Sequence, residues 1–175
     1  MSDANAQNAG QSQNGDLDPN NTVYLTLKNG RVTIRLDPEL APKHVERIKQ
    51  LCKEHFYDGT PFHRVIPGFM AQGGDPTGTG TGGSKLPDLP AEFTNKAKFL
   101  TGTCGAARTQ NPNSANSQFF ICLAPAPFLD GQYTIWGQVV QGMQYVEEIK
   151  KGSGQNGIVQ DPDRIVTMRL ASDAG

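Results

Sequence analysis

The chain lacks a marked excess of either charge, and it lacks any long apolar run. Its 175 residues contain 16 Lys and Arg against 17 Asp and Glu, which gives a formal net charge of −1 at pH 7. No apolar stretch approaches the roughly 20 residues that a membrane-spanning helix needs. We therefore expect neither a nucleic-acid partner nor a membrane partner, and the length suits one domain with its own hydrophobic core.

Cysteine is also scarce. The three cysteines, Cys52, Cys104 and Cys122, are odd in number and widely spaced, which argues against a disulfide framework and against a zinc site. Cys52 lies on an apolar helical face and Cys122 lies in an apolar run, so both are expected to be small buried hydrophobic residues. This cysteine usage fits a reducing compartment, and we expect a cytoplasmic protein.

The N-terminal segment lacks the basic region and the apolar region that a secretory signal requires. It is instead rich in Asn, Gln, Ser, Gly and Asp, a composition typical of disordered segments. We expect residues 1–20 to form a disordered polar tail and residues 21–172 to form a single folded domain.

The remaining sequence is made of short β-like runs with little helix. Residues 22–28 and 31–36 alternate apolar and polar side chains around Asn29-Gly30, which is typical of a β-hairpin. Helical spacing of apolar residues begins near Pro42 and fades at residues 57–59, and a second short helix fits residues 142–152. The six other β-like runs cover residues 60–66, 68–73, 102–107, 118–123, 133–140 and 163–170.

Eight strands and two helices, without regular alternation of strand and helix, predict a mainly β fold. The expected architecture is a closed eight-stranded antiparallel barrel capped by two α-helices.

The familiar apparatus for nucleotide, metal or hydrolytic chemistry is missing as well. Residues 78–83 formally satisfy G-x-G-x-x-G, but two prolines follow where a helix would have to hold the pyrophosphate, so a flexible surface loop is expected. His44 and His55 are expected on the surface of the first helix and His63 at a structural strand position, with no third metal ligand in view. Neither a nucleophile motif nor a pair of catalytic carboxylates is visible.

What remains is an arginine among large apolar residues, in three blocks. FHRVIPGFMAQGGD begins at Phe62, NSQFFI at Asn116 and FLDGQYTIWGQVVQGM at Phe128. In order and spacing these blocks resemble the signature of the cyclophilins, and the resemblance covers roughly residues 22–170. The pattern alone favours Arg64 as a water-facing strand residue with core residues around it. The resemblance reverses this and favours a site.

The resemblance implies a peptidyl-prolyl cis/trans isomerase, which accelerates rotation of X-Pro bonds in polypeptides and assists protein folding. It implies that Arg64 is the catalytic residue and that neither metal nor cofactor is needed. The proline pocket implied by position consists of Phe69, Met70, Phe120 and Leu129. The further substrate contacts that it implies are the backbone-binding Gln72, the peptide-pairing Ala107 and Arg108, the groove residue Gln118, and the wall residues Phe128 and Tyr133.

Three of these positions depart from the best-known form of the family. Phe128 stands where tryptophan is frequent, Tyr133 where histidine is frequent, and Arg108 where asparagine is frequent. The loop of residues 109–116 also carries one extra residue. Phe128 and the segment around Arg108 resemble bacterial members of the family, and none of the changes affects Arg64 or the residues of the proline pocket.

The expected partners are therefore proline-containing peptides and unfolded proteins, bound by a monomer, with weakened affinity for cyclosporin. Two other hypotheses stay open: a module that binds proline segments with little turnover, and a general chaperone for unfolded chains. Turnover of a proline peptide separates the enzyme from both.

Overall fold

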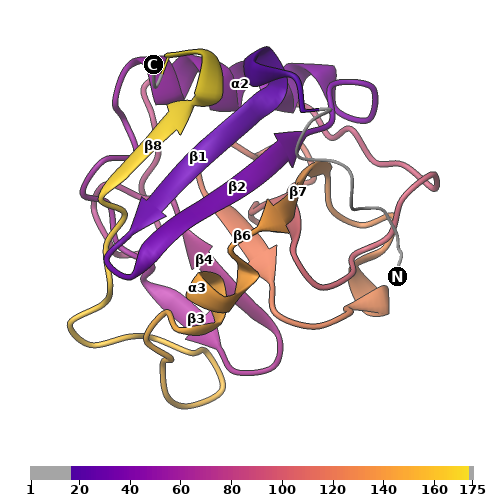
Figure 1. Cartoon of the computed structure of the whole chain (residues 1–175). Coiled ribbons are helices and arrows are strands. Elements are labelled where there is room, and N and C mark those ends of the chain that lie inside the picture. Colours follow the sequence, from indigo (N-terminus) through magenta and orange to yellow (C-terminus); the bar gives the residue numbers. More distant parts are fainter. Residues whose placement is uncertain (1–16, 174–175) are drawn as a thin grey trace.

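One sheet of eight antiparallel strands forms the centre of the molecule (Figure 1). The computed structural model describes residues 17–173, so the tail predicted for residues 1–20 falls almost entirely outside the described residues. Across the sheet the strands lie in the order β3-β4-β6-β5-β7-β2-β1-β8. Their bounds are β1 (Thr22–Leu27), β2 (Gly30–Leu36), β3 (Arg64–Ile66), β4 (Met70–Gly73), β5 (Thr103–Ala106), β6 (Phe119–Cys122), β7 (Ile135–Gln141) and β8 (Thr167–Leu170).

Both expected helices are present, and both are shorter than the periodic segments that predicted them. They are α2 (Pro42–Lys53), which lies across one end of the sheet in Figure 1, and α3 (Met143–Glu147). Single 3₁₀ turns occur at η1 (Pro19–Asn21), η2 (Pro127–Leu129) and η3 (Ala171–Asp173). Within residues 17–173, no helix has the length and apolar character needed to cross a membrane.

The predicted hairpin is confirmed, with a shift of one residue in its turn. Leu27 pairs with Gly30, so the two turn residues are Lys28 and Asn29. Gly30 is therefore the first residue of β2, and its small size serves packing, because a Cβ there would lie 2.4 Å from the ring of Tyr145.

The antiparallel barrel is confirmed, but the word closed overstates it. Strands β3 and β8 are the two edges of the sheet and do not pair with each other. Instead, the segment before β8 joins the edges through isolated bridges, Pro61 with Arg164 and Arg64 with Ile158. The sheet is thus a curled half-barrel whose gap is spanned by a connecting segment.

The expectation that His44 lies on the helix surface is wrong, whereas His55 is exposed as expected. His44 is only 3% exposed, and its Nδ1 lies 2.6 Å from a carboxylate oxygen of Glu92. The same carboxylate accepts from the backbone N–H of Lys43 and of His44, in the first turn of α2. Glu92 therefore caps this helix from a distant segment, which local periodicity cannot reveal.

Cys52, Cys104 and Cys122 are buried free thiols, which confirms the expectation for Cys52 and Cys122. Burial raises the pKa of the Cys52 thiol and of the Cys122 thiol to about 12. Both therefore stay protonated and serve as core residues.

Candidate functional site

The register of three neighbouring strands lines up the predicted site residues. Arg64 on β3 lies opposite Gln72 on β4, which in turn lies opposite Phe120 on β6. Residues opposite each other on antiparallel strands share one face of the sheet, and their neighbours along each strand face the other way. The neighbours Val65 and Ala71 are fully buried in the barrel core, so the first three residues lie on the outer face.

This outer face holds a cavity of about 490 Å³. Every predicted site residue except Gln118 lines it, and so does Gln132, which the sequence reading missed. The lining is Arg64, Phe69, Met70, Gln72, Ala107, Arg108, Phe120, Phe128, Leu129, Gln132 and Tyr133. Gln132 lies in an exposed turn between Leu129 and Tyr133, which were both predicted. Its place inside the third motif block was the only sequence signal that could have indicated it.

Apolar side chains form the floor of this cavity. Met70, Phe120 and Leu129 are 2%, 5% and 7% exposed, so each offers only a small patch to the cavity. The Phe120 ring stacks on Phe99 with centroids 5.6 Å apart. Its position depends on Gly105, directly opposite on β5, where a Cβ would lie 2.6 Å from the Phe120 ring. The floor is therefore rigid and shaped by packing from below.

Arg64 lies at the edge of this floor and is oriented by two hydrogen bonds. Its Nε donates to the carbonyl oxygen of Asn156 at 2.8 Å, and its Nη1 donates to Oε1 of Gln72 at 3.1 Å. A guanidinium carries five N–H groups, so three of them have no partner among residues 17–173. The arrangement fixes the plane of the guanidinium and leaves donors for a ligand in the cavity.

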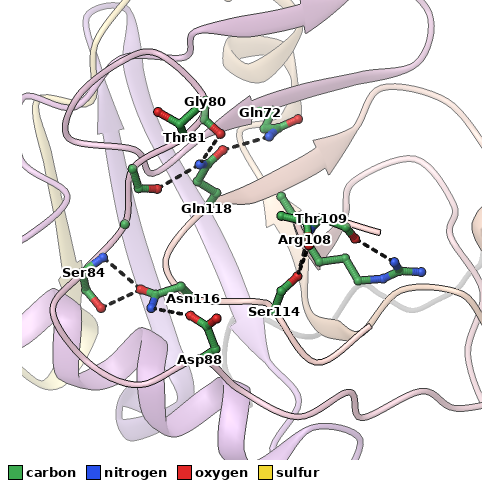
Figure 2. A pocket seen from close by; sticks show the side chains of 13 residues that line it. Gln72, Gly80, Thr81, Ser84, Asp88, Arg108, Thr109, Ser114, Asn116 and Gln118 are labelled. Carbon is green, nitrogen blue, oxygen red and sulfur yellow. Dashed lines mark hydrogen bonds between the residues drawn. The ribbon is translucent and has the colours of Figure 1, made fainter. Parts of the chain in front are cut away.

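A second cavity of about 490 Å³ lies beside the first and shares Gln72, Ala107 and Arg108 with it. Figure 2 shows this second cavity, with Gln118 between Gly80 and Gln72. Gln118 thus lines the adjacent groove, as the resemblance implied. The remaining lining of this cavity is polar, so an extended ligand crossing both cavities would meet an apolar pocket and then a polar one.

The aromatic residues Phe128 and Tyr133 also line the first cavity. The guanidinium of Arg108 lies 4.4 Å from the centroid of the Tyr133 ring and donates to the carbonyl oxygen of Gln132. Phe128 is 67% exposed, and its ring centroid is 5.3 Å from that of Phe69. Phe128 is therefore an accessible apolar residue of the site, whereas Arg108 and Tyr133 are held by their contacts.

His63 is buried beside Arg64, as expected for a structural residue. Burial lowers the pKa of His63, the nearby Asp75 carboxylate opposes this effect, and Arg64 adds to it. No group of three or more His, Cys, Asp and Glu side chains suited to a metal ion occurs within residues 17–173.

The G-x-G-x-x-G segment is a loop and is followed by further irregular chain, where a dinucleotide site would have a helix. Asp75 accepts hydrogen bonds from the amides of Thr77, Gly80 and Gly82 and from the Thr77 hydroxyl, so the loop has a defined fold.

Known proteins resemble the chain over most of its length. A family model described as "Cyclophilin type peptidyl-prolyl cis-trans isomerase/CLD" matches residues 22–170. A relative from Brucella suis named "Probable peptidyl-prolyl cis-trans isomerase" is 55% identical over 168 residues, which cover 89% of this chain and 85% of the relative. A peptidyl-prolyl cis-trans isomerase from Schizosaccharomyces pombe is 42% identical over 127 residues, covering 69% of this chain and 79% of that protein.

Two solved structures share the fold. A cyclophilin from Hirschia baltica superposes with a TM-score of 0.80 at 27% identity, covering 96% of this chain and 82% of that one. A cyclophilin-type peptidyl-prolyl cis-trans isomerase from Cryptosporidium parvum, crystallised in the presence of the dipeptide Ala-Pro, superposes with a TM-score of 0.78 at 29% identity. It covers 85% of this chain and 98% of that one.

Proposed function

The chain belongs to the cyclophilin-type peptidyl-prolyl cis-trans isomerases, and we propose that Arg64 and the apolar cavity beside it are where it catalyses X-Pro rotation. One observation carries the proposal. An oriented guanidinium with unused donors borders a rigid apolar floor large enough for a pyrrolidine ring.

The reaction is slow because amide resonance opposes rotation about the X-Pro bond. The barrier is about 18–20 kcal/mol, and unaided isomerisation takes tens to hundreds of seconds. At the twisted transition state resonance is lost, the prolyl nitrogen becomes pyramidal, and its lone pair can accept a hydrogen bond. In the planar ground state that nitrogen accepts almost nothing, so a donor aimed at it stabilises the transition state selectively.

Arg64 is suited to be that donor. Arginine stays protonated at any working pH, and its planar fork can hold a substrate carbonyl while another N–H reaches the nitrogen. A hydrogen bond from a charged group contributes roughly 1.5–3 kcal/mol, which corresponds to about 10- to 150-fold in rate.

The cavity supplies the second part of the mechanism. Phe69, Met70, Phe120 and Leu129 would hold the proline ring, and the twisted amide, being less polar than the planar one, loses less on entering an apolar site. Proton transfer, a covalent intermediate, a metal and a cofactor have no part in this scheme. Substrate contacts beyond the ring fall to the backbone-binding Gln72, the peptide-pairing Ala107 and Arg108, the groove residue Gln118 and the walls Phe128 and Tyr133.

The partners follow from the same chemistry. We propose that the chain acts as a cytoplasmic monomer on proline-containing segments of unfolded proteins, and so assists their folding. The buried free thiols and the nearly balanced charge support this assignment.

A protease-coupled isomerisation assay on a short X-Pro peptide tests the proposal. The expected result is a first-order isomerisation rate that increases in proportion to the protein concentration. Binding of the peptide without any acceleration would instead identify a proline-binding module and contradict the proposal.

A further inference from the structure

The side-chain amide of Gln118 has only one possible orientation. One of its two terminal atoms lies 2.9 Å from the carbonyl oxygen of Gly80 and 2.9 Å from that of Gly82. Carbonyl oxygens only accept hydrogen bonds, so the atom between them must be the NH₂ group, which donates one hydrogen to each. The Oε1 atom of Gln118 must therefore point the other way.

The orientation of the Gln118 amide determines that of the Gln72 amide, which in turn contacts Arg64. Oε1 of Gln118 accepts from Nε2 of Gln72 at 3.0 Å, and this leaves Oε1 of Gln72 to accept from Arg64. Arginine has no acceptor, so the atom facing it must be an oxygen, and the polarity required at this end agrees with that imposed by the two carbonyls. Figure 2 shows the links from Gly80 to Gln118 and from Gln118 to Gln72.

The two carbonyls are held in place by Asp75, which is fully buried. Its carboxylate accepts from the amide of Gly80 at 2.6 Å and from that of Gly82 at 3.1 Å. A Cβ at Gly82 would lie 2.3 Å from the carboxylate, so glycine is needed for this close approach. Burial alone would raise the pKa of Asp75, but its hydrogen bonds outweigh burial and lower the pKa to about 2. The carboxylate therefore stays ionised at working pH.

We propose that Asp75 is a positioning residue for the isomerisation. It folds the loop so that its carbonyls set the amide polarity of Gln118 and Gln72, and Gln72 then presents an acceptor to Arg64. The inference rests on the proposed function of Arg64. If the loop is loosened, the amides can rotate, and an NH₂ group of Gln72 then faces the guanidinium. Two donors repel, so the guanidinium loses its orientation toward the prolyl nitrogen.

Asp75→Asn tests the inference, with Asp58→Asn as the matched control. Asp58 is another carboxylate held by several donors, here the guanidinium of Arg169 and the amide of Met168, outside both cavities. Both variants should lose stability. Only Asp75→Asn should lower kcat/KM, by about 3- to 10-fold, as expected for a misplaced hydrogen bond. Its affinity for the dipeptide Ala-Pro, measured by NMR titration, should fall less than kcat/KM does, because the apolar floor that holds the proline ring is untouched and only the contacts of Gln72 and Gln118 change.

The hydrogen-bonded relay runs from Asp75 through the loop carbonyls to Gln118, Gln72 and Arg64. The NMR signals of these side chains report on it directly. In Asp75→Asn the NH₂ signals of Gln72 and Gln118 and the Nε–H signal of Arg64 should all shift; in Asp58→Asn they should not. Thr77→Val, which removes one hydroxyl donor to Asp75 and keeps the shape, should give smaller shifts in the same direction and covers the case in which Asp75→Asn does not fold.

The inference is overturned if folded Asp75→Asn keeps the kcat/KM of the unaltered protein, or loses it without any shift of these signals. If Asp75→Asn does not fold, the absence of any shift in Thr77→Val overturns it. Failure of the proposed function looks different, because it would show as full activity of an Arg64→Ala variant, whatever the signals of Gln72 and Gln118 do.

Discussion

Arg64 and Gln72 lie directly opposite each other on β3 and β4, and Nη1 of the arginine donates to Oε1 of the glutamine at 3.1 Å. This pair sits on the outer face of the sheet, at the border between an apolar cavity and a polar one. It couples the proposed catalytic group to a hydrogen-bonded relay that ends at a buried carboxylate.

The isomerisation rate should be nearly independent of pH, with kcat/KM varying less than about twofold between roughly pH 6 and pH 8. Arginine does not titrate in that range, and the mechanism uses no general base. Measuring the rate in a constant-ionic-strength buffer series checks this. A steep bell-shaped profile would mean that the reaction depends on an acid–base group.

Unlike the rate, the free energy of unfolding should decrease as the pH falls into the acid range. Burial lowers the pKa of His44, although Glu92 opposes it, and burial likewise lowers the pKa of His63. The unfolded chain therefore takes up protons first as the pH falls below about 6.5. The free energy of unfolding should be highest above that pH and should fall as the pH drops through the folded-state values. Urea unfolding at several pH values measures this, and greater stability at pH 5 than at pH 7 would contradict it.

Glu92→Gln should destabilise the fold with little effect on turnover. The carboxylate accepts from two amides in the first turn of α2 and lies against the buried His44 ring. Losing its charge and one acceptor should lower the free energy of unfolding by about 1–3 kcal/mol. Glu46→Gln, an exposed residue of the same helix, is the control and should change stability by less than about 0.5 kcal/mol. Equal stabilities of the two variants would show that Glu92 is no cap.

Phe128→Trp should tighten cyclosporin much more than it changes turnover. Phenylalanine keeps an aromatic wall but lacks an indole N–H, and the resemblance to the cyclophilins implies that a tryptophan at this position donates one to the drug. One hydrogen bond and some contact area correspond to roughly 1–3 kcal/mol, or about 5- to 150-fold in affinity. Arg108 and Tyr133 also depart from the family pattern, so a partial gain is expected. Inhibition constants that are equal for both proteins would place Phe128 outside the drug site.

The sequence predicted the strands, the helices and nearly the whole lining of the first cavity. The strands and helices were predictable because alternation and helical spacing are local. The lining of the first cavity followed from the resemblance to the cyclophilins, which assigned roles by position to residues of the three motif blocks. Contacts between distant segments were missed. His44 was expected on the surface because helical spacing does not reveal its contact with Glu92, which lies in another part of the chain. The loop after Asp75 was expected to be flexible because a run of glycines does not reveal the hydrogen bonds that its amides donate to Asp75.

Arg64→Ala tests most directly whether Arg64 is the catalytic group. In the protease-coupled assay on an X-Pro peptide, we expect the folded variant to lose about one to three orders of magnitude in kcat/KM, from one lost charged hydrogen bond and lost positioning. Arg31→Ala, at an exposed arginine of the N-terminal hairpin, should match the unaltered protein. If Arg64→Ala folds and keeps more than about half of the kcat/KM of the unaltered protein, Arg64 is not the catalytic group.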